Sequence, residues 1–317
     1  MRGSGYKLFF KKNSQVILIY IFLLILIVVS AFLDELFLSR RNISNLIITT
    51  IPLLLVSFAQ TIVLITGGID LSVGSIISLS NVLCATLFVK SPMSYLYSSL
   101  VAVAVGALAG YMNGLFIAKA KLQPIIVTLA TSSVIGGAAL AVLPSPGGTV
   151  NAQFASTVTG NLFGISVPLI IGLVVSALLW ILLIKTPFGV SVYAVGGNEN
   201  SAFSTGIMVN RVKIKVYVLA GILSALAGVF LSAQMYSGDP TVGVNFTTKA
   251  ITAGVVGGTS LMGGNGGIVG TIAGVFILVI INNILNFIGV PSFYQYILQG
   301  GILIAALAIG SIKTRRY

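Results

Sequence analysis

Side chains that do acid–base, nucleophilic or metal chemistry are scarce in this sequence. Its 317 residues contain no His, one Cys and five Asp or Glu. Histidine is the commonest metal ligand, and Cys84 alone cannot form an intrachain disulfide. The carboxylates do not form the cluster that an acid–base or metal centre requires. We therefore expect no catalytic residue, no metal and no cofactor in this chain, and we do not expect an enzyme.

A phosphate-binding loop is also missing from the sequence. Only Lys90, Lys185 and Lys313 are followed by Ser or Thr, and each is preceded by Val or Ile rather than by Gly. The Gly-Lys-Ser/Thr end of a nucleotide-binding loop is therefore absent. If ATP drives this protein, a partner subunit must hydrolyse it.

Polar groups inside apolar segments remain as candidates for reversible binding of a hydroxyl-rich solute. Amide and hydroxyl groups both donate and accept hydrogen bonds. The same groups also hold helices together in membranes, and that alternative applies to each of them. The candidate solute-path residues are Gln60, Asp70, Asn81, Asn113, Thr128, Phe246 and Asn282.

Asp70 is the only acidic residue near an apolar segment. The segment 67–74, Gly-Gly-Ile-Asp-Leu-Ser-Val-Gly, reads as a turn followed by a helix start, where Asp70 or Ser72 can cap backbone N–H groups. A capping role and a role in lining a solute path both stay open. Carriers driven by protons or sodium ions keep ionisable groups within the membrane, so we expect the energy for transport to come from outside this chain.

The composition indicates a membrane protein. The chain is 57% hydrophobic and 7% charged, whereas a soluble domain has roughly a quarter charged residues. The net charge of +12 does not indicate nucleic-acid binding, because the basic residues lie at segment ends and in loops.

Ten apolar segments predict an all-α polytopic protein with one membrane domain over 1–317. The first, without a cleavage site, is expected to stay as a span. The eighth is short and rich in Gly, which suggests a broken or re-entrant helix. The segments are 15–33, 46–66, 71–89, 95–118, 122–143, 163–184, 214–235, 250–262, 267–288 and 293–312.

The distribution of basic residues predicts that both termini are cytoplasmic. With ten spans and a cytoplasmic N-terminus, thirteen Lys and Arg fall inside and four fall outside. The four predicted to be outside are Arg40, Arg41, Lys90 and Lys249.

Glycines spaced by four residues suggest an internal repeat. They occur in the fourth and ninth segments, and five spans separate the two, so related halves would be inverted in the membrane. Such glycines also let helix backbones approach closely, and independent close packing is the alternative explanation. The two series are Gly106, Gly110 and Gly114, and Gly266, Gly270 and Gly274.

The predicted cytoplasmic loop 185–213 is the only internal loop long enough to form a docking element. Within it, a turn signal at 195–202 runs into a helix-compatible stretch through Ile207. A solvated loop without function is the alternative.

Three runs resemble the permeases of ribose-type ATP-binding cassette sugar importers. They are GGIDLSVGSIISLS from Gly67, AVGGNENSAFSTGI from Ala194 and GVVGGTSLMGGNGGIVGTIAGVFIL from Gly254, and the similarity extends over nearly the whole chain. The resemblance implies a bacterial inner-membrane pore of two permeases, either two copies or a copy and a paralogue. It also implies ATPase subunits that bind ATP and Mg²⁺, and an extracytoplasmic solute-binding protein.

The resemblance further implies which residues contact the ATPase. The matching positions are Gly196, Gly197, Asn198, Glu199, Asn200 and Ala202. Phe203 departs from the family's pattern, which commonly has a basic or polar residue there. The solute could be a monosaccharide, a furanosyl signal, inositol or a nucleoside.

Two other readings stay open at this point. A secondary carrier or facilitator would use Asp70 as its coupling carboxylate and would need no ATPase. A branched-chain amino-acid permease has a similar pattern of spans, although Ile69-Asp70-Leu71-Ser72 favours the sugar branch.

Overall fold

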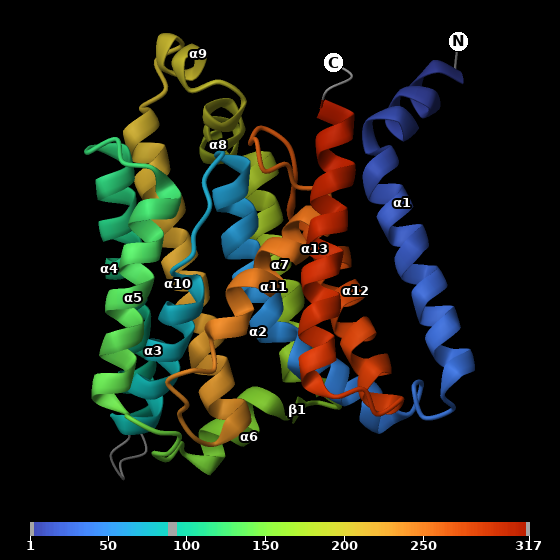
Figure 1. Cartoon of the computed structure of the whole chain (residues 1–317), viewed down its shortest axis with the longest axis vertical. Helices are drawn as coiled ribbons and strands as arrows, with labels where there is room; N and C mark the ends of the chain where they lie inside the picture. The colour runs from blue at the N-terminus through green and yellow to red at the C-terminus, as the bar shows by residue number, and fades with distance from the viewer. Residues whose placement is uncertain (1–2, 88–93, 315–317) are drawn as a thin grey trace.

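The computed structural model describes residues 3–87 and 94–314, and they form an almost entirely helical bundle (Figure 1). The helices are α1 (Gly3–Leu33), α2 (Arg40–Ile65), α3 (Val73–Thr86), α4 (Ser94–Ala118), α5 (Pro124–Val142), α6 (Ala152–Thr159), α7 (Val167–Lys185), α8 (Pro187–Gly197), α9 (Glu199–Ser204), α10 (Val209–Met235), α11 (Val244–Val256), α12 (Ile268–Phe287) and α13 (Ser292–Thr314).

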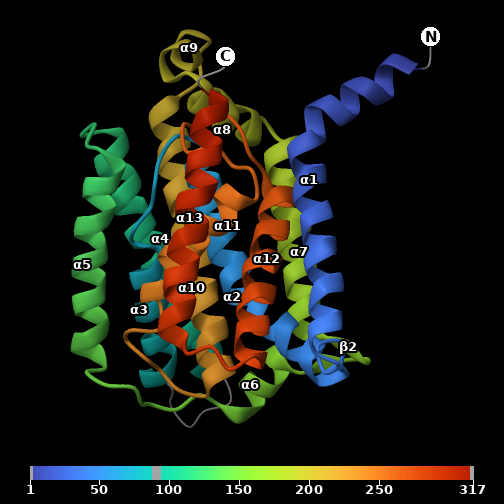
Figure 2. The ribbon, with the colours of Figure 1, turned by 45° about the vertical axis from the view of Figure 1, so that its right-hand side comes forward.

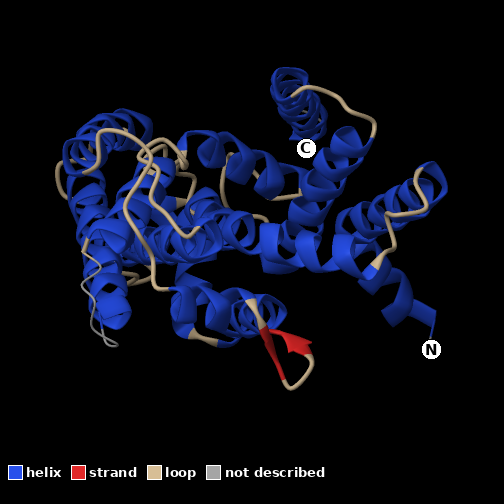
Figure 3. Ribbon diagram, turned by 90° about the horizontal axis from the view of Figure 1, so that it is seen from below, coloured by secondary structure: helices blue, strands red, loops and turns tan. Residues whose placement is uncertain are grey.

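A small antiparallel hairpin, β1 (Asn161–Leu162) and β2 (Ile165–Ser166), interrupts the helices between α6 and α7. Seen from below, it projects from the rim of the bundle (Figure 3). The hairpin occupies the start of the predicted segment 163–184, so the corresponding helix α7 begins only at Val167.

The helices confirm an all-α, multi-pass membrane protein. Each predicted apolar segment overlaps one helix, and seven helices of the described chain are long and apolar enough to cross a bilayer. Those seven are α1, α2, α4, α5, α7, α10 and α12. The count of ten spans stays a prediction.

Two of the predicted spans are half-length helices. The 14 residues of α3 and the 13 of α11 rise about 1.5 Å each, which gives roughly 20 Å against a hydrocarbon core of about 30 Å. A short eighth segment was expected, but α11 starts six residues before the predicted 250–262. The shortness of the third segment was not expected.

A non-helical segment precedes each half-length helix. Residues 66–72 follow α2 and lead back into the bundle to α3, and residues 236–243 follow α10 and lead to α11 (Figure 1). Along the second segment, Gly238 contacts Ala85 near the end of α3, whereas Gly243 contacts Gly74 at its beginning. The segment therefore runs antiparallel to α3.

The half-length helices begin beside each other and exchange hydrogen bonds. The Gly74 N–H donates to Thr247 Oγ1 at 3.1 Å, and the Gly243 N–H donates to Ser78 Oγ at 2.9 Å. A Cβ at Gly243 would lie 1.8 Å from the Gly74 carbonyl oxygen, so only glycine fits this crossing. The two bonds are reciprocal: each joins the glycine at the start of one helix to a hydroxyl four residues after the glycine of the other. Gly74 and Gly243 therefore correspond to each other, as do Ser78 and Thr247.

The predicted glycine series do allow close helix packing, but the two series do not pack against corresponding helices. A Cβ at Gly110 would lie 2.1 Å from the Tyr217 carbonyl oxygen of α10, whereas a Cβ at Gly274 would lie 2.1 Å from the Ala253 carbonyl oxygen of α11. Gly266 precedes α12 altogether. The two series face different helices, so their matching spacing does not set the register of a repeat.

The core forms around α2 and α10, which are buried over most of their length. Helices α1, α5 and α7 expose Leu, Ile and Val side chains at the periphery, as helices in contact with lipid do. Helices α8 and α9 and both ends of the described chain lie at one end of the molecule, and α6 with the hairpin lies at the other (Figures 1 and 2).

Candidate functional site

The non-helical segment 66–72 carries a fully buried carboxylate. Asp70 Oδ1 accepts hydrogen bonds from the Ser72 N–H at 2.8 Å and from Ser72 Oγ at 2.6 Å. Oδ2 of Asp70 has no hydrogen-bond partner among the described residues. The carboxylate therefore shapes the turn that precedes α3, and one of its oxygens remains free to accept a hydrogen bond. Its role in lining a solute path stays a prediction.

A chain of hydrogen bonds leads from α5 and α4 to this carboxylate. Thr131 Oγ1 donates to Asn113 Oδ1 at 2.6 Å, and Asn113 Nδ2 donates to Ser72 Oγ at 2.8 Å. Ser72 then donates to Asp70, so every donor points toward the carboxylate. Successive bonds of this kind polarise one another in a low-dielectric interior.

Thr128 ties the same segment to α5. Its Oγ1 accepts the Leu71 N–H at 3.0 Å and donates to the Pro124 carbonyl at 2.9 Å. Asp70, Asn113 and Thr128, three of the predicted path residues, therefore all bond within segment 66–72. Asp70 and Asn113 bond to Ser72, and Thr128 bonds to the Leu71 N–H.

Tyr217 is a member of the site that sequence reasoning missed. It lies in α10, is almost fully buried, and packs against the backbone of Gly68, where a Cβ would be 2.6 Å from its hydroxyl. That hydroxyl has no hydrogen-bond partner in the described chain. A buried polar atom without a partner is costly, so Tyr217 and Asp70 together offer hydrogen-bonding capacity to a polar solute.

The remaining predicted path residues lie apart from this network. Gln60 is buried in α2, with neither amide atom hydrogen-bonded to any described residue. Asn81 accepts the Asp239 N–H at 2.7 Å, and Asn282 accepts from Gln299 at 2.9 Å, so both of these amides join separate elements of the bundle. Phe246 is half-buried in α11.

One basic residue, which was predicted to lie in a loop, lies in helix α11. Lys249 was expected in an external loop, but it is half-buried in α11, with Nζ 5.9 Å from the centroid of the Phe246 ring. Its place on the external side stays a prediction. The half-length helix begins well before the predicted segment, and this shift places Lys249 within the bundle.

The predicted docking loop is largely helical. Thr186 Oγ1 caps α8 by accepting the Gly189 N–H at 3.3 Å, and Asn198 Oδ1 caps α9 by accepting the Ser201 N–H at 2.8 Å. The turn expected at Gly196 and Gly197 is instead the last turn of α8. Asn198 alone separates the two helices, because its side chain accepts the Ser201 N–H in the first turn of α9.

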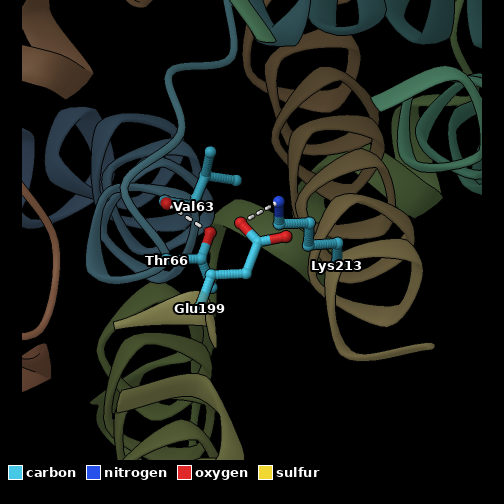
Figure 4. A network of polar contacts seen from close by, with 4 residues as sticks. All are labelled: Val63, Thr66, Glu199 and Lys213. Atoms are coloured by element: carbon cyan, nitrogen blue, oxygen red, sulfur yellow. Dashed lines mark hydrogen bonds and ion pairs between the residues drawn. The ribbon is translucent and has the colours of Figure 1, made fainter. Parts of the chain in front are cut away.

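Glu199 holds α9 to α10. Its Oε2 accepts from Lys213 Nζ at 2.6 Å (Figure 4). The Lys213 side chain is 18% exposed and that of Glu199 is 52% exposed. The carboxylate thus has a partner within the chain, so it has fewer free acceptor positions for a hydrogen bond to a second subunit.

The other residues of the element divide by exposure. Gly197, Asn198 and Asn200 are exposed, whereas Ala202 is buried under α9. Phe203 is 72% exposed, which is unusual for an aromatic side chain unless lipid or another protein covers it.

Comparisons with known proteins give one consistent result. A family described as the permease component of the branched-chain amino acid transport system matches residues 42–307. The ribose import permease protein of Bacillus subtilis is 43% identical, over 92% of this chain and 91% of the relative. The D-allose transport system permease protein of Escherichia coli is 33% identical, over 93% and 91%.

The galactose/methyl galactoside import permease protein of Escherichia coli is 32% identical, over 94% of each chain. No solved structure matches the chain.

Proposed function

The chain belongs to the family of permease components of branched-chain amino acid transport systems, and on that premise we propose that it is the membrane subunit of an ATP-driven sugar importer. The observation that carries this proposal is the end-to-end similarity to import permeases for ribose, allose and galactose. These relatives do not favour the branched-chain amino-acid alternative. The chain moves a monosaccharide without chemical change, and a separate subunit hydrolyses the ATP.

The partners follow from the transporter type. ATPase subunits that bind ATP and Mg²⁺ dock on α9, through Asn200 and Phe203. A soluble binding protein delivers the sugar at the opposite end, and a second permease, either a copy or a paralogue, completes the pore. The protein lies in a bacterial inner membrane.

The orientation places α9 and both termini in the cytoplasm. Two observations support this: these elements lie at one end of the molecule (Figure 2), and basic residues predominate in the segments assigned to that side. Ten membrane segments, two of them half-length, account for this arrangement.

An inverted repeat relates α2–α5 to α10–α13. Its support is the pair of reciprocal bonds between α3 and α11, together with helix contacts that correspond in the two halves: α10 packs on α3 and α4, and α2 packs on α11 and α12. Inverted repeats place the solute path at the repeat interface, near the bilayer midplane.

The sugar passes beside segment 66–72, where Asp70, Asn113, Thr128 and Tyr217 offer hydrogen bonds to its hydroxyl groups. Binding there is weak, because a pore that held the solute tightly in both conformations could not release it, and only a difference in affinity between the conformations can shift their equilibrium. The protein therefore works by alternating access around this segment.

Uptake by purified complexes tests the proposal. The chain is co-expressed with the ATPase and the solute-binding protein of its importer, and labelled D-ribose is offered to proteoliposomes with and without ATP. We expect uptake that requires ATP and the binding protein, and that excess D-allose or D-galactose, but not leucine, reduces. Solute counterflow by this chain alone would instead show a secondary carrier.

A further inference from the structure

Three backbone segments meet without intervening side chains at the end of α8. The Gly264 N–H donates to the carbonyl oxygen of Ile65, the last residue of α2, at 2.9 Å. A Cβ at Gly196 would lie 1.7 Å from that carbonyl oxygen and 2.7 Å from the Gly264 nitrogen. Gly196 therefore fits only because it has no side chain.

The next residue is the opposite case. A Cβ at Gly197 would meet no atom within 4 Å in the described chain, although Gly196 and Gly197 are adjacent in one motif and in one helical turn. The family resemblance assigns both glycines to the ATPase contact. The structure separates them: Gly197 faces outward and Gly196 faces the interior of the protein.

Further contacts fix the same point, which we name the α8 junction: Ile65, Gly67, Gly196, Gly263 and Gly264. Gly263 has φ +83°, and a Cβ there would lie 2.6 Å from the Gly196 carbonyl oxygen and 2.9 Å from the Gly67 nitrogen. Backbone atoms in direct contact cannot yield by rotating a side chain. A displacement of α8 must therefore displace its neighbours.

Tyr193, one turn earlier on α8, adds a polar tie. Its hydroxyl donates to the Gly266 carbonyl oxygen at 2.9 Å. Burial raises the pKa of Tyr193 above its ordinary value, so the hydroxyl stays protonated and remains a donor. Helix α8 is thus held to segment 257–267 as well as to the end of α2.

The α8 junction lies at the start of segment 66–72, which carries Asp70 and its hydrogen-bond network. We propose that Gly196 is a positioning residue that transmits the movement of α8 and α9 to segment 66–72, and so couples ATP hydrolysis to the solute path. Gly197 has no part in this transmission. The inference rests on the proposed function, because it assigns the work to an ATPase bound at α9.

Adjacent glycine variants test the inference. Gly196→Ala and Gly197→Ala complexes are reconstituted, and D-ribose uptake and ATP hydrolysis are measured in the same vesicles. A methyl group forced into a packed contact costs about 1–3 kcal/mol, so we expect sugar imported per ATP to fall by about tenfold in Gly196→Ala. Gly197→Ala should stay within about twofold of the parent.

A second variant and a structural measurement test the inference even if the Gly196→Ala complex fails to assemble. Tyr193→Phe removes the hydroxyl without adding bulk, and we expect it to lower the same ratio by about twofold to tenfold. Hydrogen exchange at Gly264 should speed up in Gly196→Ala and Tyr193→Phe but not in Gly197→Ala, since that amide donates across the junction.

Equal import per ATP in Gly196→Ala and Gly197→Ala would overturn the inference. So would a failure of Gly196→Ala to assemble together with a parental ratio in Tyr193→Phe. If the parent complex itself shows no ATP-dependent uptake, the proposed function fails instead. The exchange rates then still report whether the junction exists.

Discussion

Exchanging the charges of Glu199 and Lys213 distinguishes a contact within the chain from a contact with the ATPase. The single variants Glu199→Lys and Lys213→Glu each place like charges at a pair that is 2.6 Å apart in the native protein. The double variant restores an attractive pair with its sign reversed. A carboxylate that binds only Lys213 should be rescued by the exchange, whereas one that binds the ATPase should not.

The size of the effect follows from the exposure of the pair. Partly exposed ion pairs contribute about 0.2–1 kcal/mol, and like charges are unfavourable by similar amounts. Each reversal therefore destabilises the contact between α9 and α10 by about 0.4–2 kcal/mol. This corresponds to a roughly 2- to 30-fold smaller population of molecules in which α9 is held against α10. Salt screens exposed charges, so the loss should shrink at high ionic strength.

The assay is ATP-dependent D-ribose uptake by proteoliposomes at matched protein content. We expect each single variant to lose uptake within the stated range and the double variant to recover at least half of it. A double variant as impaired as Glu199→Lys, with Lys213→Glu unaffected, would refute the reasoning and would show that Glu199 contacts the ATPase.

Three further variants probe the network, the crossing and the docking surface. Asn113→Leu breaks the chain that ends at Asp70, so we expect about 1–3 kcal/mol less stability in thermal unfolding and reduced uptake, whereas exposed Ser133→Ala should change neither. Gly243→Ala drives a methyl into the α3–α11 crossing and should lower the unfolding temperature, whereas Gly137→Ala, which meets no described atom within 4 Å, should not; equal temperatures would contradict the crossing. Phe203→Asp should release the ATPase during co-purification without impairing membrane insertion, and full retention of the ATPase would show that Phe203 lies outside the contact.

Hydropathy located the helices but not the ends of the shortest ones. Residues 67–70 were expected to form a turn, but the third segment was drawn over 71–89, because a sliding average includes apolar residues such as Leu71 and Leu87 on either side of α3. The 14-residue α3 was therefore drawn as a full span. Helix α8 was missed for a different reason, because Gly196 and Gly197 resemble a turn and only tertiary contacts favour a helix there.

The polar candidates were predicted as a class, and only the fold could group them. Asp70, Asn113 and Thr128 come from three distant parts of the chain and meet because α4 and α5 pack beside segment 66–72. Tyr217 gave no signal, since a tyrosine in an apolar helix usually indicates an anchor at the membrane surface.

Two matching motifs, which fit the proposed repeat, lie elsewhere in the sequence than the glycine series. Asp70-Leu71-Ser72-Val73-Gly74 and Asp239-Pro240-Thr241-Val242-Gly243 share the pattern Asp-x-Ser/Thr-Val-Gly. In both, the aspartate Oδ1 accepts from the backbone N–H and the hydroxyl two residues later, at 2.8 and 2.6 Å in the first and 2.8 and 2.7 Å in the second. The shared turn starts each half-length helix, which glycine spacing alone could not reveal.

Labelling of α9 from each side of the membrane tests most directly whether a cytoplasmic motor can act on this chain. Cys84, the only cysteine, is replaced by Ala, and exposed Asn200 by Cys. We predict that a membrane-impermeant maleimide labels this cysteine in inside-out vesicles, and in right-side-out vesicles only after permeabilisation. Labelling in intact right-side-out vesicles would place α9 outside the cell, beyond the reach of any ATPase, and would contradict the account.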